Sequence, residues 1–225
     1  MPQYPLPTDW AHAFCSLGLD TTTIDRLVAQ AYADDTNTWP RATAVFRALE
    51  LTPFANVRVV VVGQDPYPSS SNATGVAFST GPQGAVTDAL RAIYTNLASH
   101  TTFVTPTHGD LTAWADRGAL LLNAALTLSP ASLDQRCRLW HPFVSAMLAA
   151  LSATGRPIPV VLLGGKAYDL RGSVTDLAAV QAAGHPTPRN KNAQRFPLFA
   201  HARPFNDASD FLVSRGQPPF DWSVA

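Results

Sequence analysis

The sequence predicts an α/β fold in which a central four-stranded parallel sheet is flanked by helices. Four apolar runs have the length and composition of buried strands: Val59–Val62, Ala119–Leu122, Ile158–Leu163 and Ala178–Gly184. Segments with helical periodicity separate these runs, as expected when crossover helices connect parallel strands. With 225 residues, 46% of them hydrophobic, and no Gly/Ser-rich linker, the whole chain (1–225) is predicted to form a single domain.

Helices are predicted from apolar residues spaced three or four positions apart. Two such stripes precede the first strand, at Ile24–Ala31 and Val45–Leu49, and two lie between strands, at Val86–Leu97 and Phe143–Leu151. A short helix is expected from Asp110, as its N-cap, to Gly118, and a last one from Asn206 or Asp207 to near Gly216. Each apolar stripe is expected to cover the sheet.

Polar residues follow each predicted strand. In order along the chain they are Asp65, Asn123, the segment Gly164-Gly165-Lys166, and His185. The carboxyl ends of parallel strands meet at one edge of a sheet, and ligands of open α/β sheets bind beyond that edge. The sequence therefore predicts a binding site built from these four strand ends.

Asp65 lies in the turn Gly63-Gln64-Asp65-Pro66-Tyr67. Pro66 fixes its own backbone and disfavours a helical conformation at Asp65, which holds the carboxylate on a stiff turn. Gly63 is expected to free the backbone for this turn. A catalytic role for Asp65 competes with a simpler one, in which the carboxylate caps the next element.

The charge of the chain is balanced but unevenly distributed. Residues 1–133 hold 6 Lys/Arg and 10 Asp/Glu, whereas residues 134–215 hold 10 and 5. Zero net charge argues against indiscriminate binding to nucleic acid. The basic segment 185–203 contains no acidic residue and is suited to contact phosphates, although a solvated loop would have the same composition.

Several functional classes are disfavoured by the sequence. Cys15 and Cys137 lack metal-binding spacing, so neither a zinc site nor a disulfide framework is expected. Neither a P-loop nor a dinucleotide-binding glycine motif is present. No apolar run is long enough to cross a membrane, and the first residues lack a signal pattern, so a soluble cytoplasmic or nucleoid-associated protein is expected.

The order of the motifs resembles that of family 1 uracil-DNA glycosylases. The strongest matches are Gly63-Gln64-Asp65-Pro66-Tyr67 with Phe78-Ser79 downstream, then Leu120-Leu121-Leu122-Asn123, then His185-Pro186-Thr187-Pro188. With weaker matches between Thr52 and Trp222, the resemblance covers about four fifths of the chain, and ordered motifs are far more specific than any single one.

This resemblance implies an enzyme that releases uracil from DNA and leaves an abasic site, the first step of base excision repair. It implies that Asp65 orients the attacking water and that His185 donates a hydrogen bond to uracil O2. It also assigns the uracil pocket to Gln64, Tyr67, Phe78 and Asn123. A structural histidine and two core aromatic rings are the simpler alternatives for His185, Tyr67 and Phe78.

The resemblance further implies contacts to DNA and the absence of a metal or organic cofactor. The expected DNA-contacting residues are Ser69, Ser70, Gly165, Lys166, Pro186, Thr187, Pro188, Arg189 and Lys191. The expected partner is uracil-containing DNA, single- or double-stranded, with a protein inhibitor as a second candidate. A monomer is expected.

The chain departs from the family pattern at several positions. Arg189 replaces the leucine that wedges into the duplex, and Ala89 replaces a phosphate-binding serine. Gly164 stands in place of a frequent tryptophan, and Asp134-Gln135 in place of a Ser-His pair. These departures leave open a related glycosylase with a shifted base preference or a single-strand preference. A uracil- or DNA-binding protein that does not cleave, or an interaction module, is the alternative from another class.

Overall fold

Four parallel strands form the centre of the computed structural model, which describes residues 4, 6–15, 17–33, 37–187 and 195–224. They are β1 (Val59–Gly63), β2 (Ala119–Asn123), β3 (Val160–Leu163) and β4 (Val180–Ala183), in the order β2-β1-β3-β4. The predicted α/β fold with a four-stranded parallel sheet is confirmed. The last two strands are shorter than expected, and a 3-10 helix, η5 (Leu177–Ala179), precedes β4.

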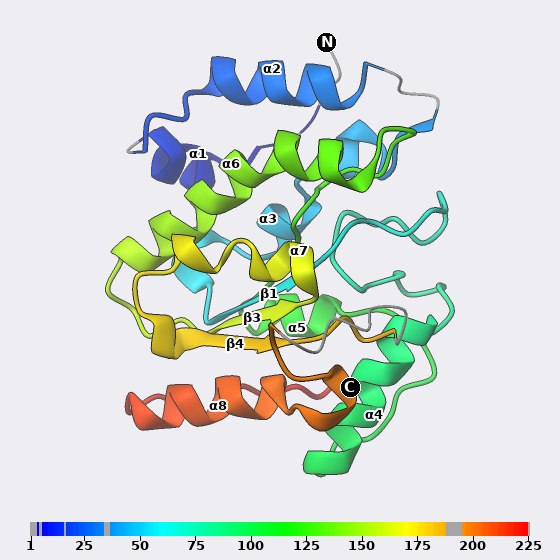
Figure 1. Ribbon diagram of the computed structural model, residues 1–225, viewed down its shortest axis with the longest axis vertical. Coiled ribbons are helices and arrows are strands. Elements are labelled where there is room, and N and C mark those ends of the chain that lie inside the picture. Colours follow the sequence, from blue (N-terminus) through cyan, green and yellow to red (C-terminus); the bar gives the residue numbers. More distant parts are fainter. Residues whose placement is uncertain (1–3, 5, 16, 34–36, 188–194, 225) are drawn as a thin grey trace.

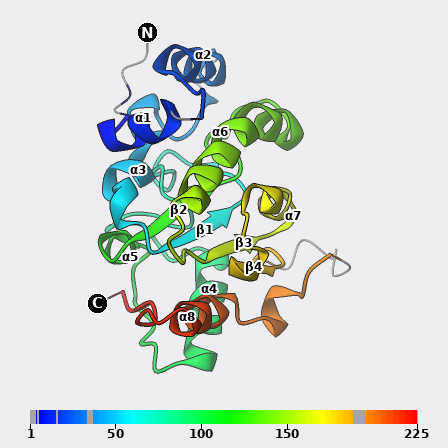
Figure 2. The same ribbon diagram turned by 90° about the vertical axis from the view of Figure 1, so that its left-hand side faces the viewer.

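Helices cover both faces of the sheet, which gives three layers (Figures 1 and 2). One face carries α1 (Thr8–Cys15), α2 (Thr21–Ala31), α3 (Arg47–Leu51), α6 (Leu133–Ala153) and α7 (Gly165–Tyr168). The other carries α4 (Asp88–His100), α5 (Thr112–Asp116) and α8 (Pro204–Ser214). The remaining 3-10 helices are η2 (Ala42–Ala44), η3 (Phe54–Asn56), η4 (Arg171–Ser173) and η6 (Phe199–His201). No helix among the described residues has the length and apolar character needed to cross a membrane.

The valine run of β1 is explained by burial on both faces. Val60 and Val62 face the core that contains Trp140, whereas Val59 and Val61 face the core that contains Trp114. Successive side chains of a strand point to opposite faces, so a strand between two helical layers must be apolar throughout. This packing fixes the position of the strand end that carries Asp65.

Several predicted helix boundaries were wrong. The fourth helix begins at Asp88 after the N-cap Thr87, so Val86 lies outside it. Asp110 is not the N-cap of α5: its Oδ1 accepts the Thr112 N–H, but Leu111 occupies the cap position. The last helix begins at Pro204. The first N–H groups of a helix have no partner within the helix, so a proline, which has no N–H, fits there without the loss of a hydrogen bond.

Two helices were not predicted. The first, α1, spans eight residues and buries only Trp10 and Phe14, too short a stripe to identify by periodicity. The other, α7, begins at Gly165, where a turn was expected. Gly164 precedes it with a φ of 98°, a conformation that favours glycine.

Candidate active site

A cavity of about 500 Å³ lies beyond the carboxyl ends of the strands. Six predicted residues line it together: Asp65 and Gln64 after β1, Asn123 at the end of β2, His185 after β4, and Tyr67 and Phe78 from the segment that follows β1. The structure thus brings together every residue predicted to act in catalysis or in the uracil pocket.

The carboxylate of Asp65 is held through both of its oxygens. Gln64 Nε2 donates to Oδ1 over 3.1 Å, and Arg136 Nη1 lies 3.0 Å from Oδ2. Because the Asp65 side chain is only 18% exposed and that of Arg136 only 9%, this ion pair is largely shielded from water. The carboxylate therefore has one orientation relative to the cavity.

Arg136 was not predicted as part of the site. It lies on α6, four residues before the buried Trp140, and therefore on the face of the helix that packs against the core. A charged residue at a core-facing helical position needs a partner, and this was the available signal in the sequence. The identity of that partner depends on the fold, since Asp65 is distant in the chain.

His185 has a defined proton position when it is neutral. The Thr187 backbone N–H donates to Nδ1 over 3.1 Å, and Thr187 Oγ1 lies 2.7 Å from the same nitrogen. With Nδ1 as an acceptor, the neutral ring carries its proton on Nε2. Burial lowers the pKa of His185 from its ordinary value, against the opposing effect of Asp65, so the neutral ring is favoured near neutral pH.

Gly63 brings Phe78 and Asn123 together at the cavity. It pairs with Asn123 across β1 and β2, and a Cβ at Gly63 would lie 2.7 Å from Asn123 Oδ1 and 3.0 Å from Phe78 Cζ. The expectation that Gly63 frees the backbone for a turn was wrong, because this residue continues the strand. Glycine is needed there for the close approach of two side chains.

The ring of Tyr67 is fixed at the wall of the cavity. Its hydroxyl donates to the Phe78 carbonyl over 3.1 Å and lies 2.7 Å from Thr87 Oγ1. Burial raises the pKa of Tyr67, so the hydroxyl stays protonated over the physiological range. A neutral, immobile ring is suited to exclude substrates by shape.

The residues predicted to contact DNA are more dispersed. Thr187 lines the cavity, whereas Ser69, Ser70, Gly165, Lys166 and Pro186 do not. Ser69 Oγ lies 2.8 Å from Ser71 Oγ in the loop after Tyr67, and Pro186 is buried. Lys166 is ion-paired with Asp134. Pro188, Arg189 and Lys191 lie outside the described residues. Ala89, at the start of α4, lines the cavity with Thr87 and Asp88.

The chain matches the sequence model of a known protein superfamily. The model of the uracil DNA glycosylase superfamily matches residues 50–209, which contain all the lining residues of the cavity. The chain belongs to this superfamily. Within the superfamily, the chain is 35% identical over 218 residues to a uracil-DNA glycosylase of Nocardioides sp., covering 96% of this chain and 92% of the relative. A uracil-DNA glycosylase of Thermobifida fusca is 33% identical over 221 residues, covering 97% and 94%.

Solved structures support the same superfamily fold. The crystal structure of mimivirus uracil-DNA glycosylase matches with a TM-score of 0.83 at 23% identity, covering 97% of this chain and 87% of that one. A mimivirus UNG variant in complex with UGI matches with a TM-score of 0.80 at 22% identity, covering 97% and 89%. At this identity the two structures bear on the fold alone.

Proposed function

We propose that this chain is a family 1 uracil-DNA glycosylase, which hydrolyses the N-glycosidic bond of a flipped-out deoxyuridine as the first step of base excision repair. The observation that carries the proposal is the meeting of Asp65, Asn123 and His185 in one cavity, from three different strand ends. The curated relatives named uracil-DNA glycosylase, which align over nearly the whole chain, support it.

The chemistry follows from the charges that develop as the bond breaks. The C1′–N1 bond cleaves with its electron pair going to uracil, so the sugar becomes cationic and the base anionic. The carboxylate of Asp65, fixed by Gln64 and Arg136, stabilises the sugar cation and orients a water whose oxygen bonds to C1′ and whose released proton passes to the carboxylate. His185 Nε2–H donates to uracil O2 as negative charge accumulates there.

The same cavity accounts for selection of the base. The Asn123 amide offers both a donor and an acceptor, which matches O4 and N3–H of uracil and mismatches cytosine. The ring of Tyr67 stands where a thymine methyl group would lie, and Phe78 stacks on the base. A nucleotide must leave the helix to reach this cavity, so flipping precedes cleavage.

The remaining assignments complete the proposal. DNA is held by residues from three parts of the chain. They are Ser69 and Ser70 after β1, Gly165 and Lys166 at the start of α7, and Pro186, Thr187, Pro188, Arg189 and Lys191 in the sequence after His185. The enzyme acts as a monomeric single domain in the cytoplasm or at the nucleoid. The complex of a mimivirus UNG variant with UGI supports a protein inhibitor as a further partner.

A second candidate is a related glycosylase that prefers uracil in single strands. Arg189 in place of an apolar wedge and Ala89 in place of a phosphate-binding serine favour it, because a single strand needs neither a filled gap nor a displaced partner base. A binding protein without activity is disfavoured, since it would have no use for an oriented carboxylate facing a neutral histidine.

Single-turnover cleavage of matched oligonucleotides tests the proposal. The wild type should release uracil, but neither thymine nor cytosine, from single or double strands, and the ratio of the two rates distinguishes the two glycosylase candidates. Asp65→Asn and His185→Leu should each slow release by roughly 100-fold or more, because each removes a group that stabilises charge in the transition state. Circular dichroism serves as the folding control. A folded variant with a rate near wild type would overturn the assignment of that residue.

A further inference from the structure

A second cavity, of about 710 Å³, lies between α2 and α6, which are neighbours in both views of the fold (Figures 1 and 2). We call it the α2/α6 groove. Three arginines line it, Arg26 from α2 and Arg136 and Arg138 from α6, and none of its lining residues is acidic. The other lining residues are polar or small apolar ones: Thr23, Leu27, Gln30, Ala31, Thr127, Ser129, Ala131, Gln135 and Leu139.

One residue that lines the groove, Arg136, has a buried guanidinium with donors that lack a hydrogen-bond partner in the described part of the chain. Arg136 is 8% exposed, and its Nε has no hydrogen-bond partner in the described part of the chain. Its Nη1 lies 3.0 Å from Asp65 Oδ2 without hydrogen-bonding geometry. A buried N–H group without a partner is costly, so a ligand that accepts from Arg136 would gain that energy on binding.

The other two charges of the groove come from Arg26 and Arg138. Arg26 and Arg138 are exposed, and within the described residues neither forms an ion pair. Two carboxylates outside the lining attract these arginines without forming an ion pair: Asp20, the N-cap of α2, interacts with Arg26, and Asp134, which is paired with Lys166, interacts with Arg138. The groove therefore has a positive potential that favours an anion.

We infer that the α2/α6 groove binds a backbone phosphate of the DNA strand whose uracil enters the first cavity. The inference rests on the proposed function and extends it. Guanidinium groups match phosphate oxygens in pairs, and the apolar stretch formed by Leu27, Ala31 and Leu139 suits a deoxyribose. DNA is favoured over a free anion because Arg136, which lines the groove, is ion-paired with Asp65, which lines the first cavity, so the two cavities lie on either side of one ion pair.

Binding of a uracil-free single strand tests the groove without depending on cleavage. Fluorescence anisotropy across a salt series should show a weaker complex for Arg26→Gln/Arg138→Gln than for the wild type. The affinity should fall on the order of tenfold, since two groups that hydrogen-bond to a phosphate through a positive charge are lost. The slope of log Kd against log salt should become shallower by about 0.7 for each phosphate that the variant no longer neutralises.

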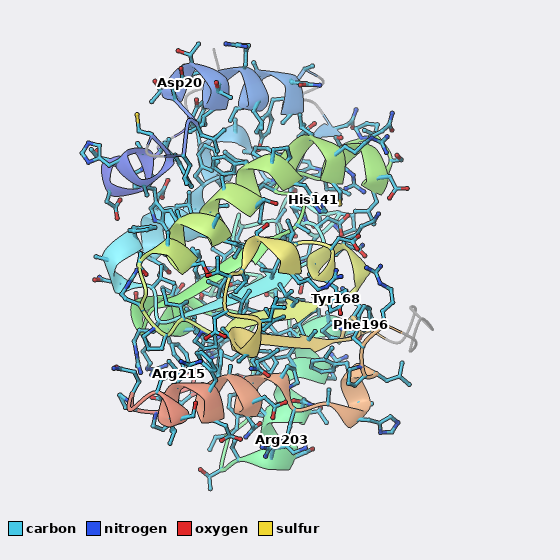
Figure 3. The ribbon with its side chains drawn as sticks, turned by 60° about the vertical axis from the view of Figure 1, so that its left-hand side comes forward. Asp20, His141, Tyr168, Phe196, Arg203 and Arg215 are labelled. Carbon is cyan, nitrogen blue, oxygen red and sulfur yellow. The ribbon has the colours of Figure 1, made fainter. Side chains whose placement is uncertain are left out.

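The matched control is Arg203→Gln/Arg215→Gln, which removes the same charge on the other side of the sheet. The two arginines flank α8, are about half exposed and are ion-paired with carboxylates within the described residues, and Arg215 also lies over the Phe211 ring (Figure 3). Asp20, at the start of α2, lies on the opposite side of the molecule in the same view. This control separates a local contact from the effect of total charge.

The groove is supported if the Arg26/Arg138 variant alone has a weaker affinity and a shallower salt slope. Equal values in the two double variants would overturn it. A second outcome would also overturn it: Arg26→Gln/Arg138→Gln loses binding of inorganic pyrophosphate but keeps the wild-type affinity and salt slope for DNA. The groove would then be a site for free anions and not for DNA. Uracil release by the same wild-type preparation separates the two proposals: DNA binding that depends on the groove, without release, would contradict the proposed function alone.

Discussion

At the scale of single residues, the addition of one methyl group at Gly63 should strongly lower the rate of uracil release. We expect Gly63→Ala to displace the Asn123 amide or the Phe78 ring, because the added Cβ would lie 2.7 Å and 3.0 Å from their atoms. Uracil release should fall by roughly 100-fold, the cost of misplacing a binding group by about 1 Å. The measurement is kcat/KM on a uracil-containing oligonucleotide.

Gly172→Ala provides the control for this change. A Cβ at Gly172 would meet no atom within 4 Å, and Gly172 does not have a positive φ. The control should therefore keep wild-type activity. If Gly63→Ala were as active as Gly172→Ala, Gly63 would not be what sets the positions of Asn123 and Phe78.

His185 should make both activity and stability depend on pH on the acid side. Burial lowers its pKa below 6.5, so the unfolded chain takes up a proton at a higher pH than the folded one. The free energy of unfolding should therefore fall as the pH drops from 6.5 through the lowered pKa, and then level off. The rate of uracil release should fall in the same window, because a protonated Nδ1 would face the Thr187 N–H as a second donor.

Denaturant unfolding and single-turnover rates across this pH range measure the two effects. The wild type contains five other histidines, so the informative quantity is its difference from His185→Leu. A difference in unfolding free energy that does not vary with pH would contradict a buried, neutral His185.

At the scale of elements, the start of α6 determines where Arg136 lies. Ser132 and Gln135 form a capping box: Gln135 N–H donates to Ser132 Oγ over 3.3 Å, and Ser132 N–H donates to Gln135 Oε1 over 2.9 Å. We expect Ser132→Ala to cost about 1 kcal/mol and to lower Tm by about 2–4 °C. Thermal unfolding measures the change in Tm.

Ser145→Ala, within the same helix, is the control. It should not lower Tm, since alanine favours helix interiors. An equal decrease of Tm in both variants would show that the Ser132 side chain does not stabilise the helix as a cap.

The elements also show which parts of the fold the sequence could predict. The strands and long helices were predictable, because a run such as Val59–Val62 fits only a doubly buried strand. Helix starts were not, because they depend on individual caps: α4 begins at Asp88, since Thr87, rather than the preceding apolar residue, is its N-cap. The end of β4 and the start of α7 depend on backbone contacts, such as Gly164 N–H with the Ala183 carbonyl, that no local pattern encodes.

The site was predictable where a strand end delivers a side chain and unpredictable where a helix does. Asp65, Asn123 and His185 follow strands, and parallel strands place their carboxyl ends at one edge. Arg136 comes from the buried face of α6, and its contact with Asp65 depends on how that helix crosses the sheet. Pairings across layers need the tertiary structure, because crossing angles and helix rotation are set by packing.

At the scale of the whole molecule, function must depend on local rather than total charge. The chain has no net charge, yet residues 134–215 hold 10 Lys/Arg against 5 Asp/Glu. The residues that line the proposed active site come both from this part of the chain and from the part before it. Local groups of positive side chains, such as the three arginines of the α2/α6 groove, are then what a polyanion can contact. Orientation of DNA on the enzyme, rather than overall attraction, is what such a distribution provides.

Salt dependence of the reaction tests this distribution. We expect kcat/KM on a single-stranded uracil substrate to fall with salt, with a log–log slope steeper than about −1, because each phosphate contact contributes about −0.7. The kcat should change little, since the groups proposed to stabilise the transition state line a cavity and are poorly screened. A substrate with uncharged methylphosphonate linkages is the control, and its slope should be close to zero. Equal slopes for the two substrates would mean that salt acts on the protein itself, and that the basic residues of the second half of the chain make no contact with the DNA backbone.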